Sequence, residues 1–205
     1  MTDRFFINLH KVLVWPVVLG LMWRFENVSI EMCVYFALHG TYSLLWLMKQ
    51  SWYPDRRFDA RRPVWIGVVF VFLPLAGYYV APYLLASRHV ALSAPMIGAI
   101  ISLYTLGIFF HYVGDAQKYY TLRAGPALIT DGLFSRVRNP NYLGEILIYC
   151  ALASLSAHWL PFLIVGGWSV LYFLPGARAK DRSLSRYPAY AAYRSRTGAF
   201  IPRIW

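Results

Sequence analysis

Charged residues are scarce in this sequence, which argues against an ordinary soluble domain. Asp, Glu, Lys and Arg together make up 14% of the 205 residues, whereas hydrophobic types make up 59% and the mean hydropathy is +0.45. A soluble domain carries roughly 25% charged residues, because its surface faces water. The composition therefore predicts an all-α integral membrane protein, a bundle of transmembrane helices.

Several kinds of site are also missing from the sequence. There are only two cysteines, Cys33 and Cys150, and both lie in apolar segments, where small core side chains are the expected role. No cluster of metal ligands with the usual spacing occurs, so we expect no metal site. The chain has neither a GxGxxG fingerprint nor a P-loop, which excludes a Rossmann or Walker nucleotide-binding fold.

Six apolar segments are long enough, or nearly so, to cross a bilayer, which takes about 20 residues per helix. They cover residues 6–23, 29–48, 64–86, 90–112, 141–157 and 159–174. We predict a single transmembrane domain over residues 1–205, with a four-helix part in 1–112 and a cofactor-binding part in 113–205. The last two helices are joined by a few residues around His158 and should form a tight hairpin.

The basic residues predict the orientation of these spans. The net charge is +11, and 18 of the 20 Lys and Arg residues fall on one side of the six segments, leaving Arg24 and Arg88 on the other. Positive charge accumulates on the cytoplasmic side of membranes, so we expect both termini and an amphipathic tail, residues 176–205, in the cytoplasm. Anionic lipid headgroups, and not nucleic acid, are the expected partners of this charge. The oligomeric state stays open.

Ionisable residues gather where the fourth span ends. His111, Asp115 and Lys118 are spaced so that they share one helical face, and Arg123 follows about two turns beyond. Ionised side chains at the end of a membrane segment are costly unless they are paired or bind something charged. The spacing predicts one wall of a polar site at this helix end.

A second wall is predicted where the fifth span begins. Pro140 should start a helix whose first two turns carry Asn141 and Glu145, with Arg136 and Arg138 just before it. A helix N-terminus is suited to phosphate groups, and Arg and Lys bind phosphates well. Carboxylate and amide side chains can bind a base or a ribose. Together these residue types indicate a nucleotide-binding site.

Two further sets of residues complete the predicted site. His39 and Tyr42 lie three apart in the second span and share a helix face, where a histidine marks either a functional site or a helix-to-helix hydrogen bond. Tyr187 and Tyr193 belong to a series of tail tyrosines at three-residue spacing, which should line one side of a short helix. With Arg194 they would either close the mouth of the site or anchor the tail at the membrane surface.

The stretch from Gly114 to Glu145, together with the ending FIPRIW, resembles the C-terminal region of the steroid 5-alpha-reductase family and its bacterial relatives. The matching residues are Asp115, Lys118, Leu122 and Arg123, then Gly132-Leu133-Phe134, then Pro140-Asn141-Tyr142-Leu143-Gly144-Glu145, and finally Tyr193 and Ile201-Pro202. In that family these positions bind NADPH, and the enzymes reduce a carbon–carbon double bond of a steroid or sterol. The resemblance implies the same activity here, on a lipophilic substrate from the bilayer of a bacterial inner membrane.

Pattern and resemblance together give a predicted set of site residues. The cofactor-binding set is Asp115, Lys118, Arg123, Arg138, Asn141, Tyr142, Glu145, Tyr187, Tyr193 and Arg194. The catalytic acid, which would polarise a carbonyl or protonate carbon, is assigned to Tyr42 or His39, with Tyr149 and Tyr104 as replacements.

The same segment is also similar to isoprenylcysteine carboxyl methyltransferases and phospholipid methyltransferases, which bind S-adenosylmethionine. Their R-H-P-x-Y-x-G pattern matches residues 138–144, except that Asn139 replaces the histidine. Where those families carry a Glu-Glu pair, this chain has Lys180 and Asp181. A methyltransferase acting on a lipid or isoprenylcysteine-like substrate is therefore the alternative function. A non-enzymatic membrane scaffold would bind neither nucleotide.

Overall fold

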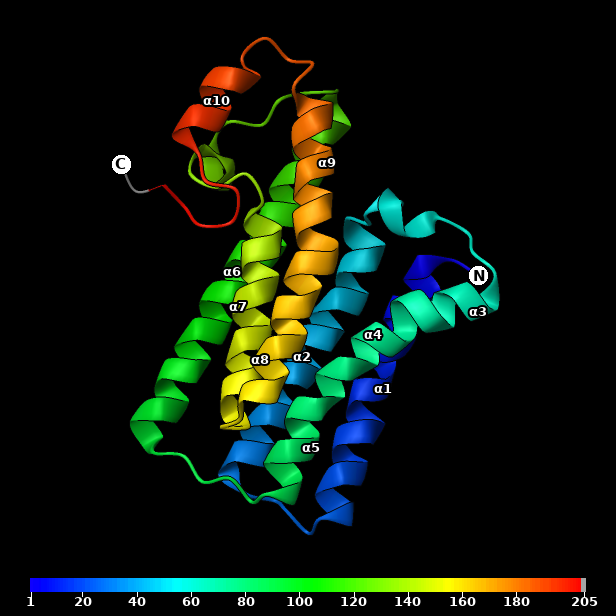
Figure 1. Cartoon of the computed structure of the whole chain (residues 1–205), viewed down its shortest axis with the longest axis vertical. Helices are drawn as coiled ribbons and strands as arrows, with labels where there is room; N and C mark the ends of the chain where they lie inside the picture. The colour runs from blue at the N-terminus through cyan, green and yellow to red at the C-terminus, as the bar shows by residue number, and fades with distance from the viewer. Residues whose placement is uncertain (204–205) are drawn as a thin grey trace. The chain divides into compact units, whose positions relative to one another are not determined.

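The computed structural model describes residues 1–203, and helices dominate that range (Figure 1). Two isolated β-bridges, Thr2 to Arg61 and Val137 to Gly198, are the extended pairings among these residues. The all-α fold predicted from composition is confirmed for the described chain. The last two residues of the FIPRIW ending, 204–205, lie outside the described residues.

The elements begin and end as follows. The α-helices are α1 (Asp3–Arg24), α2 (Ile30–Trp52), α3 (Val64–Gly67), α4 (Leu73–Ala76), α5 (Val80–Ser87), α6 (Ala94–Ala124), α7 (Pro140–Leu155), α8 (Trp159–Trp168), α9 (Leu174–Leu184) and α10 (Tyr190–Arg196). Shorter helical turns are η1 (Arg56–Asp59), η2 (Val68–Phe72), η3 (Gly77–Tyr79), η4 (Gly132–Ser135) and η5 (Ser169–Phe173). Helix α7 begins at the predicted proline, and residues 156–158 form the predicted tight turn into α8.

Two apolar runs contain a π turn followed by a proline. The η2 turn leads into α4 with Pro74 near its start, and η5 leads into α9 with Pro175 in the same place. Because proline has no N–H and its ring clashes with the carbonyl four residues earlier, the regular hydrogen-bond ladder is interrupted there. The helix nevertheless continues on both sides of each turn, so both runs keep the length of a membrane span.

Four helical runs among the described residues are long and apolar enough to cross a membrane. They are Asp3–Arg24, Val64–Ser87, Ala94–Ala124 and Trp159–Leu184. The other two predicted spans correspond to α2, whose polar residues lower its hydropathy, and α7, whose 16 residues fall short of a full crossing. The helices thus indicate an integral membrane protein, whereas the count of six spans and the cytoplasmic tail stay predictions.

The described chain divides into two compact units. The first unit holds Met1–Tyr104 and Tyr149–Ile164, and the second holds Thr105–Ile148 and the chain from Val165 on. The chain changes from one unit to the other within α6, α7 and α8. The single transmembrane domain predicted for residues 1–205, with its parts 1–112 and 113–205, stays a prediction.

In the first unit, α1 and α2 lie side by side and run in opposite directions, and α5 packs on both (Figure 1). The Thr2 hydroxyl caps the start of α1 and the Ser29 hydroxyl caps the start of α2. Between the two helices, the buried Asn27 side chain donates to the carbonyls of Leu85 and Ala86 at the end of α5. These bonds fix the three helices at one end of the unit.

In the second unit, α6 and α7 approach closely at two glycines. A Cβ atom added to Gly107 would lie 2.8 Å from the Gly144 carbonyl oxygen, and one added to Gly144 would overlap the backbone of His111. Small residues permit such close packing of membrane helices. The contact places the His111 ring, through Nδ1, 3.1 Å from the Asn141 carbonyl oxygen. Two elements of the predicted site are therefore joined by direct backbone packing.

The tail folds back onto the start of α7. The Arg138 N–H donates to the Gly198 carbonyl at 2.8 Å, and the Gly198 N–H donates to the Arg136 carbonyl at 3.1 Å. The predicted helix with three aligned tyrosines is corrected in one respect. Helix α10 begins at Tyr190, and Tyr187 lies before it because Pro188 disfavours helix at the preceding residue.

Candidate functional site

The start of α7 is held by Asn139 as well as by proline. The Asn139 carbonyl accepts hydrogen bonds from the Tyr142 and Leu143 N–H groups, both at 3.1 Å, which forms the first turn of the helix. Its side chain is 1% exposed, donates to the Ala199 carbonyl at 3.1 Å and accepts from Lys180 Nζ at 3.1 Å. The residue that departs from the methyltransferase pattern thus has a structural role in the second unit.

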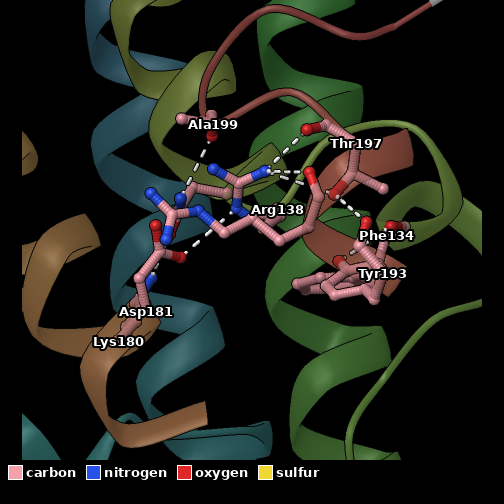
Figure 2. A network of polar contacts seen from close by, with 9 residues as sticks. Phe134, Arg138, Lys180, Asp181, Tyr193, Thr197 and Ala199 are labelled. Atoms are coloured by element: carbon pink, nitrogen blue, oxygen red, sulfur yellow. Dashed lines mark hydrogen bonds and ion pairs between the residues drawn. The ribbon is translucent and has the colours of Figure 1, made fainter. Parts of the chain in front are cut away.

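Arg138 connects the start of α7 to α9 and to the tail (Figure 2). Its Nε donates to Asp181 at 3.2 Å, and its Nη1 donates to the Thr197 carbonyl at 2.6 Å. Arg138, Asn139, Lys180, Asp181, Thr197 and Ala199 are called the Arg138 network below. A planar guanidinium suits such multiple contacts better than an ammonium would. These contacts make Arg138 a structural clamp, and a role in cofactor binding stays a prediction for this residue.

The Tyr142 ring is enclosed by its neighbours in the second unit. It stacks on Phe173 with ring centroids 4.8 Å apart, and the Lys180 ammonium lies 3.9 Å from its centroid. A Cβ atom on Gly176 would lie 2.8 Å from the Tyr142 hydroxyl oxygen. The motif tyrosine therefore packs α7 against α9, and its side chain is 7% exposed.

Two tail tyrosines are buried, which keeps them neutral. Tyr193 donates to the Phe134 carbonyl at 2.9 Å and is 2% exposed. Burial raises the pKa of Tyr193 to about 12, and burial followed by the nearby Asp181 raises the pKa of Tyr190 to about 12. Both hydroxyls remain protonated at physiological pH, so Tyr193 keeps its hydrogen bond to the loop before α7.

Exposure separates the predicted cofactor residues into two groups. Arg123 and Arg194 are exposed, and Lys118, Glu145 and Tyr187 are partly exposed, whereas Asp115, Asn141, Tyr142 and Tyr193 are buried. All of them, with Arg138, belong to the second unit. The first group has side chains that a soluble ligand can contact. The second group shapes the unit, and its binding roles stay predictions.

Replacing Arg138 by alanine is expected to release the tail from the second unit. The change leaves the Asp181 carboxylate and the Thr197 carbonyl without their guanidinium partner, at a cost of about 2–4 kcal/mol. Limited trypsin digestion should then cleave near Arg194 and Arg196 faster than in the wild type. Arg178→Ala is the matched control, because Arg178 is exposed on α9. Equal cleavage of both variants and the wild type would show that the clamp contributes nothing.

The buried face of α2 is polar along its whole length. Glu31, Tyr35, His39, Tyr42, Trp46 and Lys49 follow one another at spacings of three or four residues, and all are buried. This spacing places them on one side of the helix. The pattern is visible in the sequence, although only its His39–Tyr42 step was used for prediction.

Within the first unit, Tyr42 and His39 of α2 lie close to Lys11 of α1 and to Tyr149 of α7. Lys11 Nζ donates to the Tyr149 hydroxyl at 2.9 Å and lies 3.9 Å from the centroid of the Tyr42 ring. His39 Nδ1 lies 3.0 Å from the Tyr35 hydroxyl. We call His10, Lys11, Tyr35, His39, Tyr42 and Tyr149 the His–Tyr–Lys cluster. Its members are at most 3% exposed.

The ring of His39, near that of His10, has a nitrogen without a hydrogen-bond partner among the described residues. In residues 1–203, the Nε2 atom of His39 is buried and no group forms a hydrogen bond with it. The two rings lie 6.2 Å apart, and His10 stacks on Tyr79 at 4.9 Å. A buried polar group left unpaired costs about 1–3 kcal/mol. The buried Nε2 atom of His39 is therefore a candidate position for contact with a polar ligand group.

The predicted acids are thus all found in the first unit, but in different surroundings. His39 and Tyr42 belong to the cluster together with Tyr149, whereas Tyr104 donates to the Leu38 carbonyl at 2.8 Å. Sequence reasoning missed Lys11, whose place near a helix end would allow its ammonium to reach the membrane surface. The structure buries it. A lysine directly after a histidine in an apolar segment was the available signal.

The chain belongs to the family described as "Protein of unknown function (DUF1295)", which matches residues 24–197. This family falls within the steroid 5-alpha-reductase-like superfamily, so the resemblance noted in the sequence is confirmed at that level. The match begins at residue 24, well before Gly114, where the stretch that carries the resemblance begins.

Three relatives illustrate how distant the similarities are. The chain is 29% identical over 164 residues to the Lamin-B receptor of Drosophila melanogaster, which covers 65% of this chain and 22% of the receptor. It is 35% identical over 95 residues to an uncharacterized protein of Schizosaccharomyces pombe, covering 42% and 27% of the two chains. It is 29% identical over 108 residues to the cobalt-zinc-cadmium resistance protein CzcN of Cupriavidus metallidurans, covering 51% and 50%. The chain therefore spans half or less of the length of these relatives.

The last of these names raises the question of metal binding. Among residues 1–203, no group of three or more His, Cys, Asp or Glu side chains is placed to hold a metal ion.

Proposed function

We propose that this protein is an NADPH-dependent membrane reductase of a carbon–carbon double bond in a lipophilic, sterol-like substrate. The observation that carries the proposal is the start of α7. There Pro140 opens a helix whose first two turns present Asn141 and Glu145, in a family that belongs to the steroid 5-alpha-reductase-like superfamily. The buried His–Tyr–Lys cluster supports it, because reduction of a double bond also needs a proton donor.

The donor groups of the second unit fit a phosphorylated nucleotide. Arg123, Arg136 and Arg194 are exposed cations, and Lys118 is partly exposed. They would hold the pyrophosphate and the 2′-phosphate of NADPH, since Arg binds phosphate through paired N–H groups. The Glu145 carboxylate would accept hydrogen bonds from the nicotinamide amide or its ribose. The buried Asp115 and Asn141 would orient these groups, and the Arg138 network would keep the helix ends in place.

NADPH would supply the hydride that adds to one carbon of the double bond. The reaction would also need an acid that acts on the substrate. A conjugated carbonyl would activate the double bond, and an acid of the cluster, Tyr42 or His39 in the sequence assignment, would donate a hydrogen bond or a proton to it. The apolar helices around the cluster would exclude water, which strengthens that interaction.

The cellular setting forms part of the same proposal. With both termini in the cytoplasm of a bacterial inner membrane, the exposed arginines of the second unit would face the compartment that contains NADPH. The substrate would enter from the bilayer, because flat lipophilic molecules concentrate there. Membrane lipids would be the remaining partners, through the basic surface.

A thermal-shift titration with NADPH, NADH and S-adenosylhomocysteine tests the proposal. The purified protein in detergent is heated with each ligand, and a ligand that binds only the folded state raises the melting temperature. We expect stabilisation by NADPH, less by NADH because it lacks the 2′-phosphate, and none by S-adenosylhomocysteine. Stabilisation by S-adenosylhomocysteine alone would replace the proposal with the methyltransferase alternative. No shift with any nucleotide would favour a non-enzymatic role.

The contacts of Asn139 and Lys180 bear on that alternative. Two of the three positions at which the chain departs from the methyltransferase pattern touch each other, with Lys180 donating to Asn139 at 3.1 Å. The substituted side chains therefore form a matched pair in this chain. In the methyltransferase families these positions carry a histidine and a glutamate. The amide–ammonium pair of this chain therefore supports a site with different chemistry.

A further inference from the structure

The contact between Lys11 and Tyr149 is the most specific polar contact in the His–Tyr–Lys cluster. The ammonium of Lys11 comes from α1 and the phenol of Tyr149 from α7, and the two atoms are 2.9 Å apart. Both side chains belong to the first unit and are 2% and 3% exposed. An ammonium buried among apolar helices is costly, so a lysine in this place is a functional candidate.

The Tyr149 ring is held on three sides. It stacks on Tyr78 with centroids 3.5 Å apart and planes 7° apart, which leaves little freedom of rotation. The rings of Tyr42 and His39 meet it edge to face at 5.7 and 6.2 Å. A catalytic group works best when packing fixes its geometry before the substrate binds. The Tyr149 hydroxyl meets that condition.

The direction of the hydrogen bond decides what Tyr149 can do. An ammonium only donates, so the Tyr149 oxygen accepts from Lys11 and its own proton is directed elsewhere. The other candidates differ, because Lys11 contacts Tyr42 through the ring face and His39 already shares Nδ1 with the Tyr35 hydroxyl. The Tyr149 hydroxyl oxygen therefore lies directly against the Lys11 ammonium.

We propose that Tyr149 is the proton donor to the substrate and that Lys11 is its positioning residue. The assignment rests on the proposed function and replaces Tyr42 and His39 as first choice. As hydride adds to the β carbon of an enone, the Tyr149 O–H bond breaks and a new O–H bond forms on the substrate's carbonyl oxygen. The resulting enol takes a proton from water at its α carbon and releases the oxygen-bound proton. One hydride and one proton are consumed in total.

Lys11 completes the proton balance at Tyr149. Its ammonium stabilises the phenolate while the charge exists and then returns a proton to the phenolate oxygen, after which solvent reprotonates the amine. A phenol is far too weak an acid to protonate an isolated alkene. The pair therefore suits a double bond conjugated to a carbonyl.

The test compares Tyr149→Phe, Lys11→Met and Lys11→Arg with the wild type in lipid nanodiscs. A single turnover of bound NADPH with 4-cholesten-3-one, a flat lipophilic enone, is followed by absorbance, and NADPH affinity is measured separately. Tyr149→Phe and Lys11→Met should slow the turnover about 100-fold or more with unchanged NADPH affinity. Lys11→Arg, which keeps the charge, should recover part of the rate. Tyr83→Phe is the matched control, because Tyr83 is exposed on α5.

A solvent isotope measurement separates a chemical role from a packing role. The wild-type turnover should slow in D₂O, and Tyr149→Phe should lose that sensitivity because no exchangeable proton remains at the position. Turnover at the wild-type rate by Tyr149→Phe would overturn this assignment while leaving the reductase proposal intact. If Lys11→Met and Lys11→Arg lose the same fraction of the turnover rate, the charge of Lys11 does not matter and its role is packing alone. Failure of the wild type to bind NADPH would overturn the proposed function and this assignment together.

Discussion

Replacing Glu145 by glutamine is expected to weaken NADPH binding by about 10- to 100-fold. The amide keeps the shape of the side chain but removes the charge that would strengthen its hydrogen bonds to the nicotinamide amide or ribose. A hydrogen bond to a charged group contributes about 1.5–3 kcal/mol, and each 1.4 kcal/mol changes affinity tenfold. The measurement is the same thermal-shift titration, repeated across a range of NADPH concentrations.

The control for this prediction is Glu26→Gln. Glu26 is an exposed carboxylate in the turn between α1 and α2, in the other unit, and its replacement makes the same change in net charge. NADPH affinity should stay at the wild-type level in that variant. A folded Glu145→Gln protein with unchanged affinity would remove Glu145 from the cofactor site.

Replacing Gly144 by alanine should strongly destabilise the second unit. The new methyl group would overlap the backbone of His111 and Gly107 on α6. Backbone atoms in a helix cannot relieve such an overlap by changing rotamer, as a side chain can. Overpacking of this kind costs about 3 kcal/mol. For a chain of this size the melting temperature should fall by roughly 6–12 °C. Because α7 also carries Asn141 and Glu145, ligand stabilisation should be lost as well.

Gly98→Ala provides the comparison. Gly98 lies on α6 too, and a Cβ atom there would meet nothing within 4 Å. This variant should melt at or slightly above the wild-type temperature, since alanine is the better helix former. A melting temperature for Gly144→Ala equal to that of Gly98→Ala would show that the two helices are not packed as closely as described.

Local signals in the sequence account for most helix positions. Pro140 predicted the start of α7 correctly, because its fixed φ angle suits a first helical turn. The apolar part of the fourth span ends at residue 112, and the shared helical face of His111, Asp115 and Lys118 predicted that the helix continues beyond it, as α6 does to Ala124. Charged residues do not stop a helix, and the first true stop signals are Gly125 and Pro126. Pro175 likewise permits α9 to continue to Leu184, where the sequence suggested a change to an interfacial tail.

The site was harder to predict, because its contacts join distant parts of the chain. The sequence singled out Arg138 and Asn141 from local chemistry alone. It gave no means of pairing Arg138 with Asp181 or Asn139 with Lys180, since such pairs depend on how three segments pack. The same holds for Lys11 and Tyr149, which are 138 positions apart. Helical periodicity shows which face a residue lies on, but not which helix it meets.

The return of the tail onto α7 has a consequence for biosynthesis. Helix α7 leaves the ribosome well before Asp181, Thr197 and Ala199, the residues that hold its first turn in place. During translation the motif is therefore present without its clamp, and the second unit can reach its final form only after synthesis has passed Ala199. Nascent chains arrested shortly after residue 176 should contain α7 but lack the contacts of the Arg138 network. The second unit is therefore completed late in synthesis.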